Sequence, residues 1–133
     1  MSQINIGIVV GSARRDAFTK KVAEEFVSFL PESYQVKFLK IDHLELFNQD
    51  YDDDGTTPES WKAFREEVKA MDAYIFVTPE YNRSIPPVLK NALDIASRPY
   101  GQNSWSGKPG AVISVSPGAT GAFGANHHLR QVL

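Results

Sequence analysis

Four short apolar segments alternate with longer amphipathic segments along this chain. The apolar segments are rich in β-branched residues and cover residues 4–10, 34–41, 73–78 and 111–116. Such runs are typical of strands that helices cover on both faces. The second segment alternates only partly between apolar and polar positions, and we therefore expect it at an edge of the sheet.

Between these segments, apolar residues recur at the three- and four-residue spacing of helices that bury one face. The helical patterns cover residues 18–30, 58–71, 86–96 and, incompletely, 127–133. We expect Thr57 to cap the second helix and Pro58 to take its first position. Residues 48–57 are polar and predict a loop. The alternation predicts an α/β fold with a doubly wound parallel sheet in the flavodoxin-like order 2-1-3-4.

The loop after the first strand, "GSARRDAFTK", has the composition of an anion site. Ser12 and Thr19 supply hydroxyls, Arg14 supplies a guanidinium, and the helix beginning at Phe18 supplies free amides. Neither the P-loop nor the dinucleotide fingerprint fits, since both patterns require a glycine where Asp16 stands. Taken alone, the loop is equally compatible with an ordinary solvated turn.

Two more loops of unusual composition follow the third and fourth strands. They read "TPEYNRSIPPVLKNALD" and "SPGATGAFGA". In a sheet of order 2-1-3-4, the first, third and fourth strands end side by side, where doubly wound folds bind their ligands. Their joint occurrence therefore predicts one ligand site at the carboxyl ends of these strands.

The chain resembles the NADPH-dependent FMN reductase family of flavodoxin-like proteins, which includes quinone, azo-dye and chromate reductases. The matching segments are "GSARRDAFTK", "TPEYNRSIPPVLKNALDIASRP", "GKPGAVISVSPG" and "HLRQVL". The resemblance implies that the FMN phosphate is held by Ser12, Arg14, Phe18 and Thr19. It places the isoalloxazine ring between two groups, Pro79, Glu80, Tyr81 and Asn82 on one side and Ser116, Pro117 and Gly118 on the other. No catalytic side chain is implied because FMN itself carries the hydride, and we expect Glu80 to order its loop through backbone contacts.

Three positions and the length depart from the family pattern. Ala17 replaces a common serine, Thr19 replaces a common asparagine, and Gly124 replaces an arginine that some members use in subunit contacts. Family members continue beyond the position of Leu133 with a fifth strand and a last helix. We therefore expect residues 1–133 to form a single flavodoxin-like FMN-binding domain that is truncated at its C-terminus.

The implied function is an FMN-dependent NAD(P)H oxidoreductase. It would pass a hydride from NADPH or NADH through FMN to a quinone-like or other small acceptor, as a homodimer or a tetramer. The alternative is a flavodoxin-like FMN-binding electron carrier without a nucleotide substrate, and an inactive fragment is a third hypothesis. Electron carriers are markedly acidic, so a net charge of −2 and the pair Arg14 and Arg15 favour the reductase.

Composition excludes several other classes of function. The chain has no cysteine, which removes disulfides, thiolate metal sites and a thiol nucleophile. Its net charge of −2 argues against nucleic acid, and it has no apolar run long enough to span a membrane. Because only three residues precede the first strand, we expect no leader sequence and a cytoplasmic location.

No metal site is expected. Asp50, Asp52 and Asp54 match half of a calcium loop, but Trp61 stands at the position that requires a glutamate. We expect a solvated acidic loop there. The adjacent His127 and His128 would diverge on a helix, which makes them a poor pair of ligands.

Overall fold

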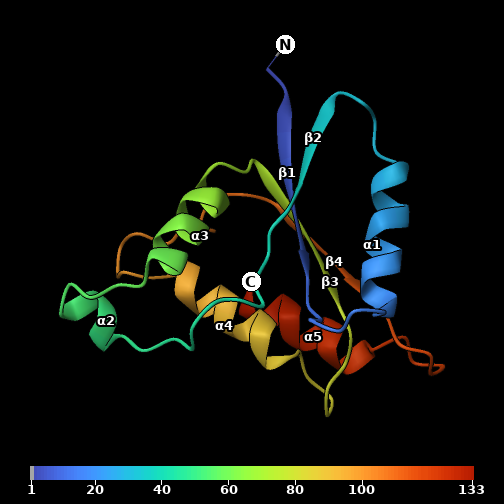
Figure 1. Cartoon of the computed structure of the whole chain (residues 1–133). Helices are drawn as coiled ribbons and strands as arrows, with labels where there is room; N and C mark the ends of the chain where they lie inside the picture. Colours follow the sequence, from blue (N-terminus) through green and yellow to red (C-terminus); the bar gives the residue numbers. More distant parts are fainter. Residues whose placement is uncertain (1) are drawn as a thin grey trace.

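The computed structural model describes residues 2–133 and contains one four-stranded parallel sheet (Figure 1). The strands are β1 (Ile4–Val10), β2 (Tyr34–Phe38), β3 (Ala73–Thr78) and β4 (Gly110–Ser114), in the order β2-β1-β3-β4. All three pairings are parallel, and the β1–β3 register runs from Ile6 opposite Ala73 to Val10 opposite Val77. The predicted fold class, strand order and edge position of β2 are confirmed.

The helices among residues 2–133 are α1 (Phe18–Ser28), α2 (Asp50–Asp53), α3 (Glu59–Lys69), α4 (Pro87–Ala96) and α5 (Phe123–Val132). Helix α1 covers one face of the sheet, while α3, α4 and α5 cover the other (Figure 1). The connections between strands therefore place helices on both faces of the sheet, as a doubly wound fold requires.

The alternation of side chains along β1 and β3 divides the core into two clusters. Ile8 and Val77 face α1, whereas Val9 and Phe76 face the three helices on the other side. The larger cluster contains Trp61, which is fully buried, as its helical spacing predicts. The two clusters pack against opposite faces of the sheet and hold the strand ends, from which the loops extend, in place.

Several predicted boundaries were wrong by a few residues. Strand β2 ends at Phe38 rather than at residue 41, β4 covers Gly110–Ser114 rather than 111–116, and α5 begins at Phe123 rather than at 127. The N-cap of α3 is Pro58, not Thr57. The Thr57 hydroxyl has other acceptors for its one proton, since Asp52 Oδ1 lies at 2.8 Å and the Tyr51 carbonyl oxygen at 3.2 Å.

The predicted polar loop at residues 48–57 contains a helix, α2, and a buried ion pair. Arg65 of α3 forms two bonds with the Asp52 carboxylate, at 2.8 and 2.7 Å, and its Nε donates to the Ile95 carbonyl at 3.0 Å. The Arg65 guanidinium beside Asp52 holds the pKa of that carboxyl below its usual value. Asp52 is therefore not a solvated residue, and it is not free to ligate calcium.

Residues 2–133 contain neither a candidate metal cluster nor a helix able to span a membrane. The described side chains include no group of three or more histidine, aspartate or glutamate residues placed to hold a metal ion. Among the same residues, every helix is too short or too polar to cross a lipid bilayer.

Candidate active site

The three loops singled out in the sequence lie at the same end of the sheet. Strands β1, β3 and β4 run in one direction and end close to the start of α1 (Figure 1). Two backbone bonds join their ends, from the Gly11 amide to the Val77 carbonyl at 2.8 Å and from the Val115 amide to the Thr78 carbonyl at 2.9 Å. The structure thus gathers the segments 11–19, 79–82 and 116–118 around one edge. Their roles in FMN binding remain a prediction.

The start of α1 has unsatisfied hydrogen-bond donors. Its N-cap, Ala17, supplies no side-chain bond, and the first turn contains no acidic residue. The amides of Phe18, Thr19 and Lys20 lie in that first turn, where a helix offers them no carbonyl. A helix that begins without a cap and without a nearby carboxylate favours an external anion.

A buried hydroxyl points to the same conclusion. Thr19 is 2% exposed, and its Oγ1 has no hydrogen-bond partner among residues 2–133. The other such atom in this part of the chain, Ser104 Oγ, lies near Tyr74 at the opposite end of β3. Buried hydroxyls are normally bonded, so Thr19 indicates a missing acceptor at the start of α1.

Ser12 and Arg14 lie in the loop that leads into α1. Together with Thr19 and the first-turn amides, they form a group of donors that we call the cradle. The Ser12 hydroxyl accepts a bond from the Arg14 amide at 3.3 Å, which leaves its own proton available. The Arg14 side chain is exposed and belongs to none of the ion pairs described for residues 2–133. Gly11 brings the cradle against the next loop, because a Cβ there would lie 3.1 Å from Leu89 and 3.4 Å from Pro79.

The loop after β3 forms a tight turn that projects beyond the sheet (Figure 1). The amides and carbonyls of Tyr81 and Ser84 bond to each other at 2.9 and 3.0 Å. Both central residues, Asn82 and Arg83, have positive φ values, 50° and 69°. Two left-handed residues in this position define a type I′ turn, which asparagine adopts readily and arginine does not. The turn presents Tyr81 with 41% of its surface exposed.

Helix α5 is hydrogen-bonded to this turn. Glu80 Oε2 accepts a bond from the Ala125 amide at 3.0 Å, within the first turn of α5. This backbone contact agrees with the expectation for Glu80, and its role beside FMN stays a prediction. The Ser84 hydroxyl also lies 3.0 Å from His128 Nδ1. At Gly124, a Cβ would lie only 2.8 Å from the Arg83 carbonyl oxygen, so the loop and helix meet where a side chain is absent.

Sequence reasoning did not identify these supporting residues. The sequence suggests other roles for His128 and Gly124 and no role for Ala122. Ala122 has a φ of 61° and is buried at the N-cap of α5. The only signal in the sequence was the glycine-rich stretch before α5, which does not reveal a partner forty residues earlier.

The loop after β4 is fixed at its base. Ser114 Oγ donates to the Gly121 carbonyl at 2.8 Å and accepts a bond from Asn126 Nδ2 at 3.0 Å. At the tip, the Gly118 amide donates to the Ser116 hydroxyl at 3.1 Å. The predicted ring-binding segment 116–118 is therefore a closed loop anchored to α5, not part of a strand.

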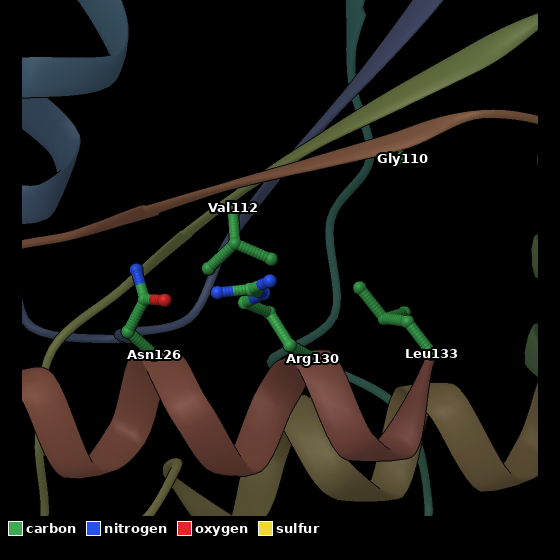
Figure 2. A pocket seen from close by; sticks show the side chains of 5 residues that line it. All are labelled: Gly110, Val112, Asn126, Arg130 and Leu133. Atoms are coloured by element: carbon green, nitrogen blue, oxygen red, sulfur yellow. The ribbon is translucent and has the colours of Figure 1, made fainter.

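Two cavities of the described structure differ in their relation to this site. One, of about 410 Å³, lies between β4 and α5, where Asn126 and Arg130 face Val112 (Figure 2). None of the predicted site residues lines it. The other, of about 690 Å³, lies between β2 and α1, and Ser12 and Arg14 form part of its wall.

The fold defines a flavodoxin-like α/β domain whose predicted site residues gather at the carboxyl ends of its strands. Residues 4–133 match the model of the NADPH-dependent FMN reductase family, and the chain belongs to that family. This membership confirms the predicted oxidoreductase class, with FMN as the cofactor and NADPH or NADH as the co-substrate. It favours the reductase hypothesis over a simple electron carrier.

Known relatives agree with this assignment. The chain is 53% identical to a quinone reductase from Pseudomonas putida, over 100% of this chain and 72% of that protein. It is 50% identical to a 2-hydroxy-1,4-benzoquinone reductase from a Burkholderia species, over 97% of this chain and 69% of that protein. A solved structure of FerB, a flavoenzyme NAD(P)H:(acceptor) oxidoreductase from Paracoccus denitrificans, is similar with a TM-score of 0.90 and 40% identity. That similarity covers 96% of this chain and 69% of that one.

Proposed function

We propose that this protein is a quinone reductase that binds FMN at the carboxyl ends of β1, β3 and β4. Its reductant is NADPH or NADH, and its acceptor is a quinone or a similar small molecule. The observation that carries the proposal is the buried Thr19 hydroxyl, which has no hydrogen-bond partner among residues 2–133. It lies at the start of a helix that no side chain of the same residues caps. The relatives from Pseudomonas putida and Burkholderia are both named as quinone reductases, which supports a quinone as the acceptor.

The cradle at the start of α1 fits a phosphate monoester. It combines the Thr19 and Ser12 hydroxyls, the guanidinium of Arg14 and the first-turn amides. All of these groups donate hydrogen bonds, and the first turn contains no acidic residue. A doubly charged phosphate matches such a set, whereas a cation or an apolar group does not.

The remaining residues of the site orient the ring system. In this proposal, the Pro79–Asn82 segment and the loop at Ser116–Gly118 border the isoalloxazine on two sides. When bound, FMN supplies the hydride chemistry, so the chain needs no acid, base or nucleophile of its own. Glu80 is already bonded to the start of α5, which suits a residue that positions its turn.

The proposal includes a homodimer in the cytoplasm. Helix α4 follows the turn directly, and in the family resemblance its outer side forms the subunit contact. Lys90 and Asp94 on α4 pair at 2.7 Å and remain partly exposed in this single chain. Analytical ultracentrifugation of the purified protein would test the assembly, and a strictly monomeric species would contradict a dimer.

Flavin binding and turnover test the main proposal. The purified full chain is titrated with FMN, and oxidation of NADPH and of NADH is then followed with a benzoquinone acceptor. We expect one FMN per chain and turnover that depends on added FMN. FMN binding without turnover would support the electron carrier instead, and failure to bind FMN would contradict the proposal.

A further inference from the structure

The cavity between β2 and α1 lies beside the proposed phosphate cradle. Its volume of about 690 Å³ falls within the range of small-molecule sites. Ile8, Val10 and Phe38 form its floor, and Phe38 is 40% exposed, at the end of β2. The cavity therefore offers an apolar surface with an aromatic ring, next to the groups proposed to hold FMN.

The wall of this cavity carries an excess of positive charge. Its charged residues are Arg14, Arg15, Lys20, Lys40, Glu24 and Asp42. Four cations against two carboxylates leave an excess of two, in a chain whose net charge is −2. The ion pairs described among residues 2–133 involve none of these six residues. Unpaired cations around one cavity favour an anionic ligand.

The apolar lining of this cavity and its positive charge together indicate a class of ligand. An apolar floor suits a planar ring, and a cationic wall suits phosphate groups. The cavity also shares Ser12 and Arg14 with the proposed FMN cradle, so a molecule bound in the cavity would lie beside bound FMN. A dinucleotide can extend from there toward the flavin, because a pyrophosphate joins its two halves.

We propose that this cavity binds the adenosine 2′-phosphate portion of NADPH. Phe38 and the aliphatic floor contact the adenine, and Arg15, Lys20 and Lys40 bind the phosphate. This inference rests on the proposed function, since it assigns a place to the reductant of that reaction. It also assigns a coenzyme preference, because NADH lacks the 2′-phosphate that these three cations would recognise.

Direct binding of a fragment tests the assignment without turnover. Adenosine 2′,5′-bisphosphate is titrated calorimetrically into the FMN-saturated full chain, in the wild type and in Lys20→Gln and Lys40→Gln. Each substitution removes a charged hydrogen bond and is expected to weaken binding about tenfold. Lys21→Gln is the matched control, because Lys21 is the next residue on α1 but does not line the cavity.

The control and adenosine 5′-monophosphate make the result specific. We expect Lys21→Gln to bind like the wild type and the monophosphate to bind more weakly than the bisphosphate. Equal affinity in all four proteins, or no binding to the wild type, would overturn the assignment. FMN titration of the same samples tests the proposed function separately. If FMN fails to bind while the bisphosphate still shows the expected pattern, the cavity assignment stands and the proposed function fails.

Discussion

Two arginines of this chain have opposite environments. Arg65 on α3 is 9% exposed, bonded twice to Asp52 and once to the Ile95 carbonyl. Arg14, before α1, is exposed and has no carboxylate partner among residues 2–133. Two threonines repeat the contrast: among residues 2–133, the Thr57 hydroxyl has two acceptors within reach and the Thr19 hydroxyl has no partner.

The polar groups at the α2–α3 contact stabilise the fold, whereas those at the start of α1 are proposed to bind a ligand. Where α2 meets α3, every polar group named above has its partner within the chain, so the region needs nothing from outside. At the start of α1, donors are buried or gathered without acceptors, which lowers stability unless a ligand provides them. Substitutions in each region should therefore affect stability at the α2–α3 contact and ligand affinity at the start of α1.

The largest effect is expected where the bonds are complete. Arg65→Ala would leave the Asp52 carboxylate buried without its partner, and we expect a loss of about 3–5 kcal/mol in the free energy of unfolding. Urea denaturation would measure it. Lys62→Ala is the control, because Lys62 pairs with Glu59 at the surface and such pairs contribute about 0–1 kcal/mol. A similarly small loss for both variants would contradict the structural role of Arg65.

The pH dependence of unfolding sharpens this prediction. Because Arg65 lowers the pKa of Asp52 in the folded state, that carboxylate stabilises the protein above its ordinary pKa of 3.8. The stabilisation is lost as the pH falls through the lower pKa of the folded state. We expect the stability difference between the wild type and Asp52→Asn to shrink as the solution is acidified. A difference independent of pH would contradict this account.

The second effect concerns ligand binding rather than stability. Arg14→Ala should weaken FMN binding by about 1.5–3 kcal/mol, because it removes a charge-assisted bond to phosphate. Flavin fluorescence titration would measure the affinity, and the stability of the unliganded chain should stay within about 0.5 kcal/mol of the wild type. Arg130→Ala, at an exposed arginine of α5, should leave FMN affinity unchanged. An unchanged affinity in Arg14→Ala would remove Arg14 from the site.

The third effect lies where the turn meets α5. In Gly124→Ala, the new Cβ would lie 2.8 Å from the Arg83 carbonyl oxygen and 3.0 Å from Glu80 Oε2. Backbone must move to accommodate it, and we expect a loss of about 1–3 kcal/mol in stability. Thermal unfolding would report the loss. The control is Gly110→Ala, whose Cβ would meet only the Phe76 ring, at 3.5 Å; equal effects at both positions would contradict the close approach.

The smallest effect is expected for Thr19→Val, which should preserve or raise stability but lower FMN affinity. Thr19→Val replaces an unsatisfied buried hydroxyl with a methyl group of similar shape, so the stability of the unliganded chain should stay the same or rise. FMN affinity should fall by about 0.5–1.5 kcal/mol, because one phosphate bond is lost. Thr57→Val provides the reverse control, since it removes a hydroxyl with two partners and should lower stability. A clear loss of stability in Thr19→Val would show that its hydroxyl is satisfied within the chain.

The sequence predicted those features that depend on local pattern. The strands at Ile4–Val10 and Ala73–Thr78 were predicted to the residue, because each is a continuous apolar run. The convergence of three loops followed from the strand order alone. Helix α2 was missed because its polar residues show no apolar face, and Asp52 reaches its partner thirteen residues further along the chain.

The missed supports of the site share that cause. Helix α5 begins four residues before the predicted position, at a left-handed Ala122, and its first turn is bonded by Glu80. No local pattern around Ala122 indicates a helix start, because the acceptor comes from a loop 45 residues away. The same long-range contacts give the predicted ring-binding loops their fixed positions.

The charge distribution has a consequence for the speed of binding. Helix α2, with exposed carboxylates at Asp50 and Asp53, lies at the far side of the molecule from the cationic start of α1 (Figure 1). A nucleotide approaching in solution is therefore repelled on one side and attracted on the other. Screening over about 10 Å at moderate salt weakens this guidance. Association rates of phosphorylated ligands should accordingly fall with ionic strength more steeply than those of uncharged quinones.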